Sequence, residues 1–365
     1  MRIVRPERKK QAAAALPWGT ESPNLDFLRA NAVLMVLVFH VASSFGIRQL
    51  GPFDLEAMGM FGVLSFFVHT SFVLMLSLRR QMTKLGRQKL FLIFMGRRCF
   101  RIYPLSICVV ALILLFKLPL SGHPWAMTWA DPLSPIDILS NFLLTQNLTG
   151  STPLEGPLWS LSYEVQMYLL LPALFVLTKR LRSPWLAVAG WFVVAVGIFI
   201  LRRLGYGLLL QYIPCFLSGI IAYKFSGETQ PRWAFWGWPI LLWALTALFA
   251  LSGRLGVGWL VCFVMGMALP RFVEVRSIFI QRVSYYISKY SYGFYLSHYF
   301  CQWFSFSRLR SIPAASQWMI FVVLLVLLPV LLYHLIEQPA ITLGKKLIDE
   351  RLAFSGMRFL AREAA

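Results

Sequence analysis

The sequence predicts an all-α membrane protein, a bundle of about ten transmembrane helices. Of its 365 residues, 58% are hydrophobic and only 14% are charged, and the mean hydropathy is +0.66. Soluble globular domains have about 25% charged residues. The apolar residues also gather into runs near the length that crosses a bilayer. These observations exclude a soluble globular protein, and we expect no second, soluble domain.

Ten apolar runs define the expected helices in chain order. They cover residues 25–45, 57–78, 101–118, 158–178, 185–201, 206–223, 236–251, 256–270, 286–305 and 316–337. Each run is close to the length of a spanning helix, which needs about 20 apolar residues. We therefore divide the chain into a cytoplasmic basic segment (1–24), a transmembrane domain (25–339) and a cytoplasmic amphipathic tail (340–365).

The basic residues set the expected orientation of these helices. The net charge of +20 would favour nucleic acid if it were spread over a soluble surface. Of the 35 Lys and Arg residues, however, 28 lie on one set of alternate connections and seven on the other. Cytoplasmic loops carry this excess in membrane proteins. We expect the lipid bilayer as partner, no nucleic acid, and both termini in the cytoplasm.

The first helix carries two ionisable side chains, Arg29 and His40, in an apolar run. Eleven residues at 100° each return to within roughly 20° of the start, so both lie on one face, roughly 16 Å apart. Ionisable groups inside a spanning helix usually mark a functional pathway. Alternatively, Arg29 anchors the helix and His40 is a packing residue. The small Val33 and Val36 between them predict a passage along this face.

Three arginines, Arg97, Arg98 and Arg101, open the third predicted helix at its cytoplasmic end. They fit an anchor at the inner membrane surface. They also fit a phosphate site, because guanidinium groups bind phosphate through two parallel hydrogen bonds and lysine does not. Such a site would face the compartment that holds phosphorylated cofactors.

The long connection from residue 118 to residue 157 has the composition of an outer loop. It contains no Lys or Arg and carries Asp131, Asp137 and Glu155. Loops of this length are uncommon unless they are functional. It is a candidate lid or acceptor-binding element, with a plain connector as the alternative.

Glu164 lies about seven residues into the fourth helix, which enters from the outer side. Its expected depth matches that of His40, about fifteen residues into a helix that enters from the cytoplasm. A buried Glu beside a His holds the imidazole in one tautomer and raises its basicity. We expect Glu164 to orient His40 as a catalytic pair. The alternative is a lone polar residue near the outer interface.

Two further histidines, His69 and His298, are intramembrane candidates, although a lone histidine between helices is more often a packing residue. The five cysteines are scattered without C-x-x-C spacing, so we expect neither a disulfide framework nor a metal site. In the tail, Lys345 and Lys346 begin a mixed basic and apolar stretch. This pattern predicts a helix lying on the anionic inner leaflet.

Seven short motifs occur in an order that resembles the acyltransferase 3 family of bacterial membrane acyltransferases. The closest match is 158–172, at the start of the fourth helix. The others are 25–40, 66–72, 97–104, 216–219, 290–298 and 336–339. The resemblance covers roughly residues 24–345. The chain departs from the family pattern at His69–Ser71, where a stretch ending in Ser-Gly is usual.

The resemblance implies transfer of an acyl group, most often acetyl from acetyl-CoA, to a hydroxyl of a cell-envelope or exported carbohydrate or glycolipid. It also implies the bacterial cytoplasmic (inner) membrane as location. Acyl-CoA would be a donor substrate, with no cofactor bound permanently. Its phosphates would bind Arg97, Arg98 and Arg101, together with Arg29. His40 would be the general base, oriented by Glu164; an acyl-histidine intermediate is the rival mechanism.

Two functions from other classes use the same residues differently. A transporter or flippase for an anionic lipid or metabolite would recognise its cargo with the arginines. The helices, however, show no evident inverted repeat or paired Gly/Pro-broken segments, which are typical of such transporters. A scaffold for envelope enzymes would instead tolerate substitution of His40 and Glu164.

Overall fold

The computed structural model describes residues 22–85, 89–118, 133–206, 208–348 and 350, and these residues form a bundle of helices. The helices long and apolar enough to cross a membrane are α1 (Pro23–Ser44), α2 (Leu55–Leu85), α3 (Leu90–Phe116), α6 (Leu158–Arg180), α7 (Pro184–Arg203), and α12 (Ala314–Leu332) with its continuation through the π-helix η4 (Tyr333–Glu337) to Ile348. The remaining long elements are α8 (Ile213–Ser226), α9 (Gly237–Ser252), α10 (Leu255–Ala268) and α11 (Ile278–Gln302).

The prediction of an all-α membrane bundle is confirmed in its coarse form. Each of the ten predicted runs lies on a helix, but within the described ranges only six helices meet the length and apolarity of a membrane span. The helices α8, α9 and α10 have 14, 16 and 14 residues, fewer than a straight crossing needs. The helix α11 is long enough, but polar side chains such as Gln281 and Lys289 lower its hydropathy.

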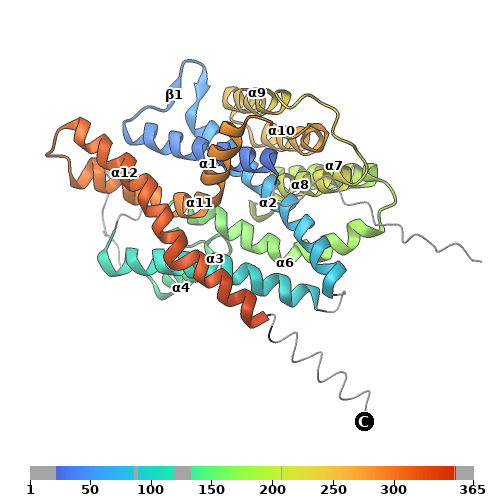
Figure 1. Cartoon of the computed structure of the whole chain (residues 1–365), viewed down its shortest axis with the longest axis horizontal. Helices are drawn as coiled ribbons and strands as arrows, with labels where there is room; N and C mark the ends of the chain where they lie inside the picture. Colours follow the sequence, from blue (N-terminus) through green and yellow to red (C-terminus); the bar gives the residue numbers. More distant parts are fainter. Residues whose placement is uncertain (1–21, 86–88, 119–132, 207, 349, 351–365) are drawn as a thin grey trace, which may run out of the picture.

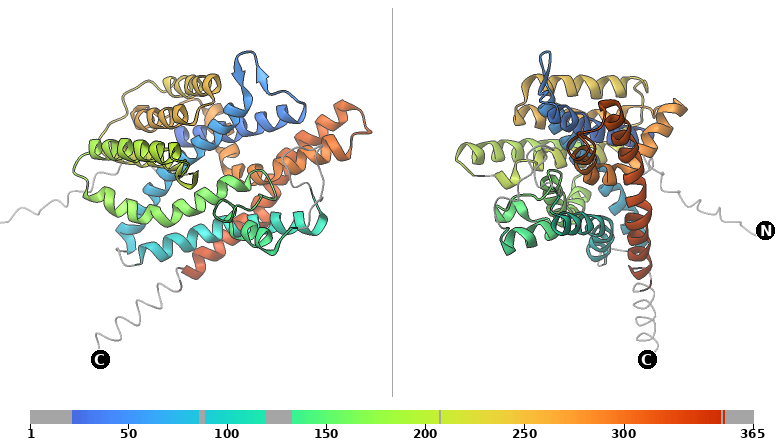
Figure 2. Two further views of the ribbon diagram at one scale, coloured as in Figure 1. Left: turned by 180° about the vertical axis from the view of Figure 1, so that it is seen from behind. Right: turned by 90° about the vertical axis from the view of Figure 1, so that its left-hand side faces the viewer.

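The helices that carry the candidate residues lie in the middle of the bundle. Figure 1 shows α1, α2 and α11 between the α9–α10 pair at one end and α3 with α4 (Pro135–Leu143) at the other. The views in Figure 2 show the same order from behind and from the side. A two-stranded hairpin, β1 (Gln49–Leu50) and β2 (Phe53–Asp54), links α1 to α2. The fold thus surrounds the polar face of α1 with other helices.

The start of α1 is fixed by a carboxylate from far along the chain. Ser22 caps the helix, and its hydroxyl donates to Glu274 Oε1 at 2.6 Å. The backbone N–H of Asn24 donates to Glu274 Oε2 at 2.8 Å, and the Asn24 side chain bonds the backbone of Val273 and Val275. A negative charge at a helix N-terminus is favourable because the first N–H groups have no partner within the helix. The segment before α11 therefore sets the position of α1.

Glycines allow close approach of the central helices. A Cβ on Gly62 of α2 would lie 2.5 Å from the backbone oxygen of Ala32 and 3.0 Å from Val36 Cγ2 in α1. Val33 and Val36 are 5% and 2% exposed. The predicted passage along this face of α1 is therefore wrong, because these side chains are buried and Val36 packs directly against α2.

Two predicted boundaries also change. The helix α3 begins at Leu90 rather than at residue 101, because the apolar stretch before the arginines is helical and its Phe94 is fully buried. The connection 118–157 is not a plain loop in its described part, which contains α4 and α5 (Gln146–Thr149). The basic segment up to residue 21 and the tail beyond residue 350 lie outside the described residues.

Candidate active site

Arg29 and His40 do share one helix, as predicted, and both are half-buried in α1. Their separation of eleven positions places the two side chains at separate parts of the bundle. Arg29 faces a small polar pocket, and His40 contacts the far end of α11.

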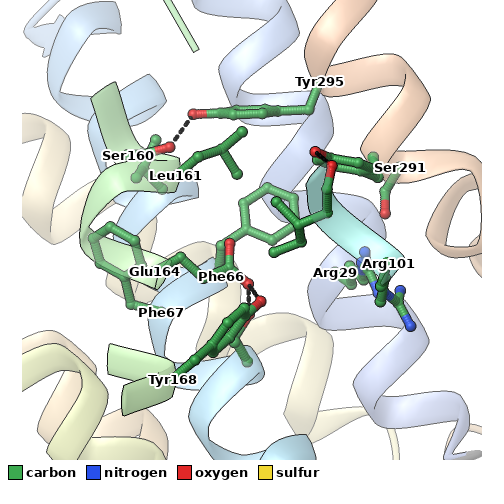
Figure 3. Close-up of a pocket in the computed structure, with 14 residues that line it drawn as sticks. Arg29, Phe66, Phe67, Arg101, Ser160, Leu161, Glu164, Tyr168, Ser291 and Tyr295 are labelled. Atoms are coloured by element: carbon green, nitrogen blue, oxygen red, sulfur yellow. Dashed lines mark hydrogen bonds between the residues drawn. The ribbon is translucent and has the colours of Figure 1, made fainter. Parts of the chain in front are cut away.

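The pocket at Arg29 brings together polar residues from five helices. We call it the arginine pocket. Its polar lining comes from Arg29 of α1, Thr70 of α2, Arg101 of α3, Ser160, Glu164 and Tyr168 of α6, and Ser291 and Tyr295 of α11. Figure 3 shows Arg29 and Arg101 on one side of the pocket, with Glu164 on the other. The cavity volume is about 60 Å³, which admits a few water molecules or one small group.

Glu164 is held inside this pocket. The hydroxyl of Tyr168 donates to its carboxylate, and Thr70 Oγ1 donates to the same oxygen at 3.3 Å (Figure 3). Above it, the hydroxyls of Ser160 and Tyr295 are 2.7 Å apart. The Nε of Arg29 is buried and has no hydrogen-bond partner in the described structure. A buried donor without a partner is costly, so this pocket is suited to receive an acceptor group from a ligand.

The four arginines predicted to bind the phosphates of the donor occupy different places. Arg29 and Arg101 line the arginine pocket. Arg98 instead lines a cavity of about 320 Å³ between α3 and α6, with its guanidinium 5.9 Å from the centre of the Phe94 ring. Arg97 lines neither of these two cavities. The structure thus brings two of the four together and places the others up to a turn earlier on α3.

His40 lies against two residues of α11. Its Nδ1 is 2.6 Å from the hydroxyl of Tyr299, and its ring centre is 5.1 Å from that of His298. His298 is 2% exposed, and its Nδ1 lies 2.9 Å from the backbone oxygen of Tyr295. A carbonyl only accepts, so this nitrogen of His298 carries the proton. The other nitrogen, Nε2, is buried without a partner in the described structure.

The expected contact between His40 and Glu164 does not appear. Within the described ranges, His40 bonds Tyr299, whereas Glu164 bonds Thr70 and Tyr168. The physical reason lies along α11: Tyr295 reaches the arginine pocket, but the residue facing His40 is Tyr299, one helical turn further on. Equal expected depth did not make the two side chains neighbours.

Two further polar residues, the candidate His69 and Glu337, are buried in the bundle. His69 is buried on α2, at 6% exposure, in electrostatic range of Arg29 and Arg101. Glu337, in η4, is 2% exposed, with one carboxylate oxygen unpartnered among the described residues. The described segments contain no group of three or more His, Cys, Asp or Glu side chains placed to hold a metal ion.

A family model for an acyltransferase domain matches residues 22–334. The chain belongs to the acyltransferase 3 family. The match begins at the cap of α1 and extends into η4, so it includes His40, the arginine pocket and all of α11. The chain is also similar to "Acyltransferase MdmB" of Streptomyces mycarofaciens, with 31% identity over 180 residues. The similar region covers 46% of this chain and 43% of that relative. No solved structure matches the chain.

Proposed function

We propose that this acyltransferase moves an acyl group, most readily acetyl, from acyl-CoA to a hydroxyl of a cell-envelope or exported carbohydrate, in the bacterial cytoplasmic (inner) membrane. The observation that carries the proposal is the placement of His40. Its ring is hydrogen-bonded to the hydroxyl of Tyr299. His40 lies on the same helix as Arg29, whose buried Nε has no hydrogen-bond acceptor among the described residues. The family membership supports acyl transfer rather than transport or a scaffold role.

The donor is proposed to approach from the arginine side. A cavity of about 60 Å³ is too small for a nucleotide, so we assign only a narrow part of the donor or a single phosphate to Arg29 and Arg101. Arg97 and Arg98 lie up to a turn earlier on α3 and are assigned to the remaining phosphates. Guanidinium groups suit this role because they bind phosphate in a bidentate geometry.

The proposed chemistry centres on His40. A ring nitrogen of His40 takes the proton from the acceptor hydroxyl while that oxygen attacks the thioester carbon. The new C–O bond forms, the C–S bond breaks, and the thiolate of CoA leaves and takes up the proton. In the rival sequence His40 itself first carries the acyl group. Since Glu164 contacts Thr70 and Tyr168, we assign it to balancing charge and ordering side chains in the arginine pocket.

The experiment is to replace His40 with Ala and to follow release of free CoA thiol from acetyl-CoA by the purified protein in detergent. General-base catalysis contributes typically 10²–10⁴-fold, so we expect a loss of that size. The melting temperature and the size-exclusion profile, which should both stay unchanged, serve as the folding control. Near-normal thiol release by His40→Ala would exclude this mechanism, and wild-type protein that releases none from any acyl-CoA would contradict acyl transfer from CoA.

A further inference from the structure

A large apolar cavity lies further along α3 and α11 than the arginine pocket. Its volume is about 580 Å³, within the range of small-molecule sites. The walls come from the second half of α3, the end of α11, the π-helix η3 (Trp303–Arg308) and α12. They are almost wholly hydrocarbon and aromatic, represented by Leu112, Phe300 and Leu328.

One end of this cavity is polar and includes the residue that holds His40. Tyr299 lines the cavity and bonds His40 Nδ1 at 2.6 Å. Beside it is Glu155, which is 5% exposed and has one carboxylate oxygen buried without a partner among the described residues. Gly156 lets Tyr299 approach this segment closely, since a Cβ there would lie 2.6 Å from Tyr299 Cε2. The unsatisfied oxygen is suited to a hydroxyl donor from a ligand.

The second half of α11 contacts all three features. Ser291 and Tyr295 face the arginine pocket, Tyr299 faces His40, and Phe300 lines the apolar cavity. A donor at the arginine pocket and a molecule in the cavity would therefore contact different residues of α11. That arrangement suits a reaction with two substrates, one at each site.

We infer that the apolar cavity binds a hydrocarbon portion of the acceptor and presents the acceptor hydroxyl to Glu155, Tyr299 and His40. The acceptor class is thus a hydroxyl compound joined to an apolar group, for example a glycolipid, rather than a free sugar. This inference rests on the proposed function, because it assigns the second substrate of the same acyl transfer. The competing occupant, a long acyl chain of the donor, would enter from the arginine side instead.

The test uses alkyl glucosides, from methyl to decyl, as acceptors for acetyl-CoA with full-length protein in lipid nanodiscs. The readouts are thiol release and the mass of the ester product. Burial of a methylene stabilises by about 0.8 kcal/mol, so kcat/KM is expected to rise by up to roughly fourfold per added methylene. Partition into the bilayer produces a similar trend, so matched variants are needed.

Two neighbouring leucines of α12 provide the matched pair. Leu328 lines the cavity, whereas Leu327 is 53% exposed on the outer face of the helix. Leu328→Trp fills the cavity and should flatten the dependence of kcat/KM on alkyl length. Leu327→Trp should keep the wild-type dependence in the same nanodiscs. Glu155→Ala should lower transfer to all glucosides by a similar factor, since it acts on the hydroxyl.

The outcomes separate the two proposals. Equal dependence on alkyl length in Leu328→Trp and Leu327→Trp would overturn the inference. A Leu328→Trp variant that loses only its response to longer acyl-CoA donors would also overturn it and assign the cavity to the acyl chain. If wild-type protein releases no thiol with any acceptor or with water, the proposed function itself fails.

Discussion

The two facing histidines differ in their freedom to exchange a proton. His298 donates its Nδ1–H to the backbone oxygen of Tyr295, so it has one tautomer. His40 instead meets a hydroxyl of Tyr299, which both donates and accepts. His40 can therefore switch tautomer without losing its partner. This difference makes His40 the ring suited to take up and release a proton, with His298 as its neutral neighbour.

The first prediction removes that hydroxyl. Tyr299→Phe should lower kcat for thiol release about five- to tenfold, because one hydrogen bond contributes about 1–1.5 kcal/mol. The ring still fills its place beside Gly156, so the melting temperature should hardly change. Tyr286→Phe, at a position 56% exposed on the same helix, is the control. An unchanged kcat in Tyr299→Phe would show that the phenol does not position His40.

The second prediction concerns pH and Glu155. Burial raises the pKa of Glu155 well above its ordinary value of 4.5. A carboxyl with a raised pKa makes its full contribution to stability at pH values below its pKa in the unfolded state. That contribution is lost as the pH rises through its pKa in the folded state. The neutral Glu155→Gln should not show this loss. Its melting temperature should exceed that of wild type at pH 8, and the difference should shrink toward pH 5; a constant difference would contradict the burial of a titrating carboxyl.

The sequence identified a candidate site residue only where that residue type is rare among its neighbours in the chain. Arg29 and His40 stood out because an apolar helix seldom contains them. Tyr299 did not, since α11 contains six tyrosines. Glu155 was noted only as an acidic loop residue. The contact between His40 and Tyr299 joins positions 259 residues apart, and the composition of neither segment specifies it.

At the scale of helices, packing depends on glycines at the crossing points. A Cβ on Gly219 of α8 would lie 2.0 Å from Ser71 Oγ and 2.2 Å from the backbone oxygen of Val68 in α2. At Gly197 of α7 nothing lies within 4 Å. The clash of a Cβ on Gly219 with the backbone oxygen of Val68 cannot be relieved by rotating a side chain. Close approach through small residues is the usual means by which membrane helices pack.

The third prediction compares these two glycines. Gly219→Ala should destabilise the protein by about 1–3 kcal/mol or more, because overpacking forces the backbone apart. Gly197→Ala should be neutral or slightly stabilising, since alanine has the higher helix propensity. Thermal unfolding in detergent measures both. Equal melting temperatures would show that α8 does not approach α2 as closely as described.

Helix positions followed from apolar runs, but helix ends did not. The apolar run predicted α3 to begin at residue 101, which is too late. The arginines interrupt the apolar stretch, but the chain remains helical through them. The short helices α4 and α5 escaped prediction because their nine and four residues leave no periodic signal. The π-helix η3 also has no sequence signature, yet it forms part of the apolar cavity.

At the scale of the whole molecule, the expected orientation assigns sides to the two cavities. The arginines of α3 would face the cytoplasm, and the segment with α4 and α5 would face outward. The fourth prediction follows: alkaline phosphatase fused after Gly150 should be active, and a fluorescent protein fused between α2 and α3 should be fluorescent. The reverse pattern at either site would exclude donor entry from the cytoplasm at the arginines.

The hydrogen bonds between Glu274 and the start of α1 have a consequence for biosynthesis. The start of α1 is translated 250 residues before its partner carboxylate. Until Glu274 is made, α1 has a capped end without its counter-charge, and Tyr299 does not yet exist. A nascent chain therefore inserts α1 long before that helix reaches its final register. The surroundings of His40 are completed only after residue 299 is made, so a protein truncated before residue 274 is expected to be inserted but inert.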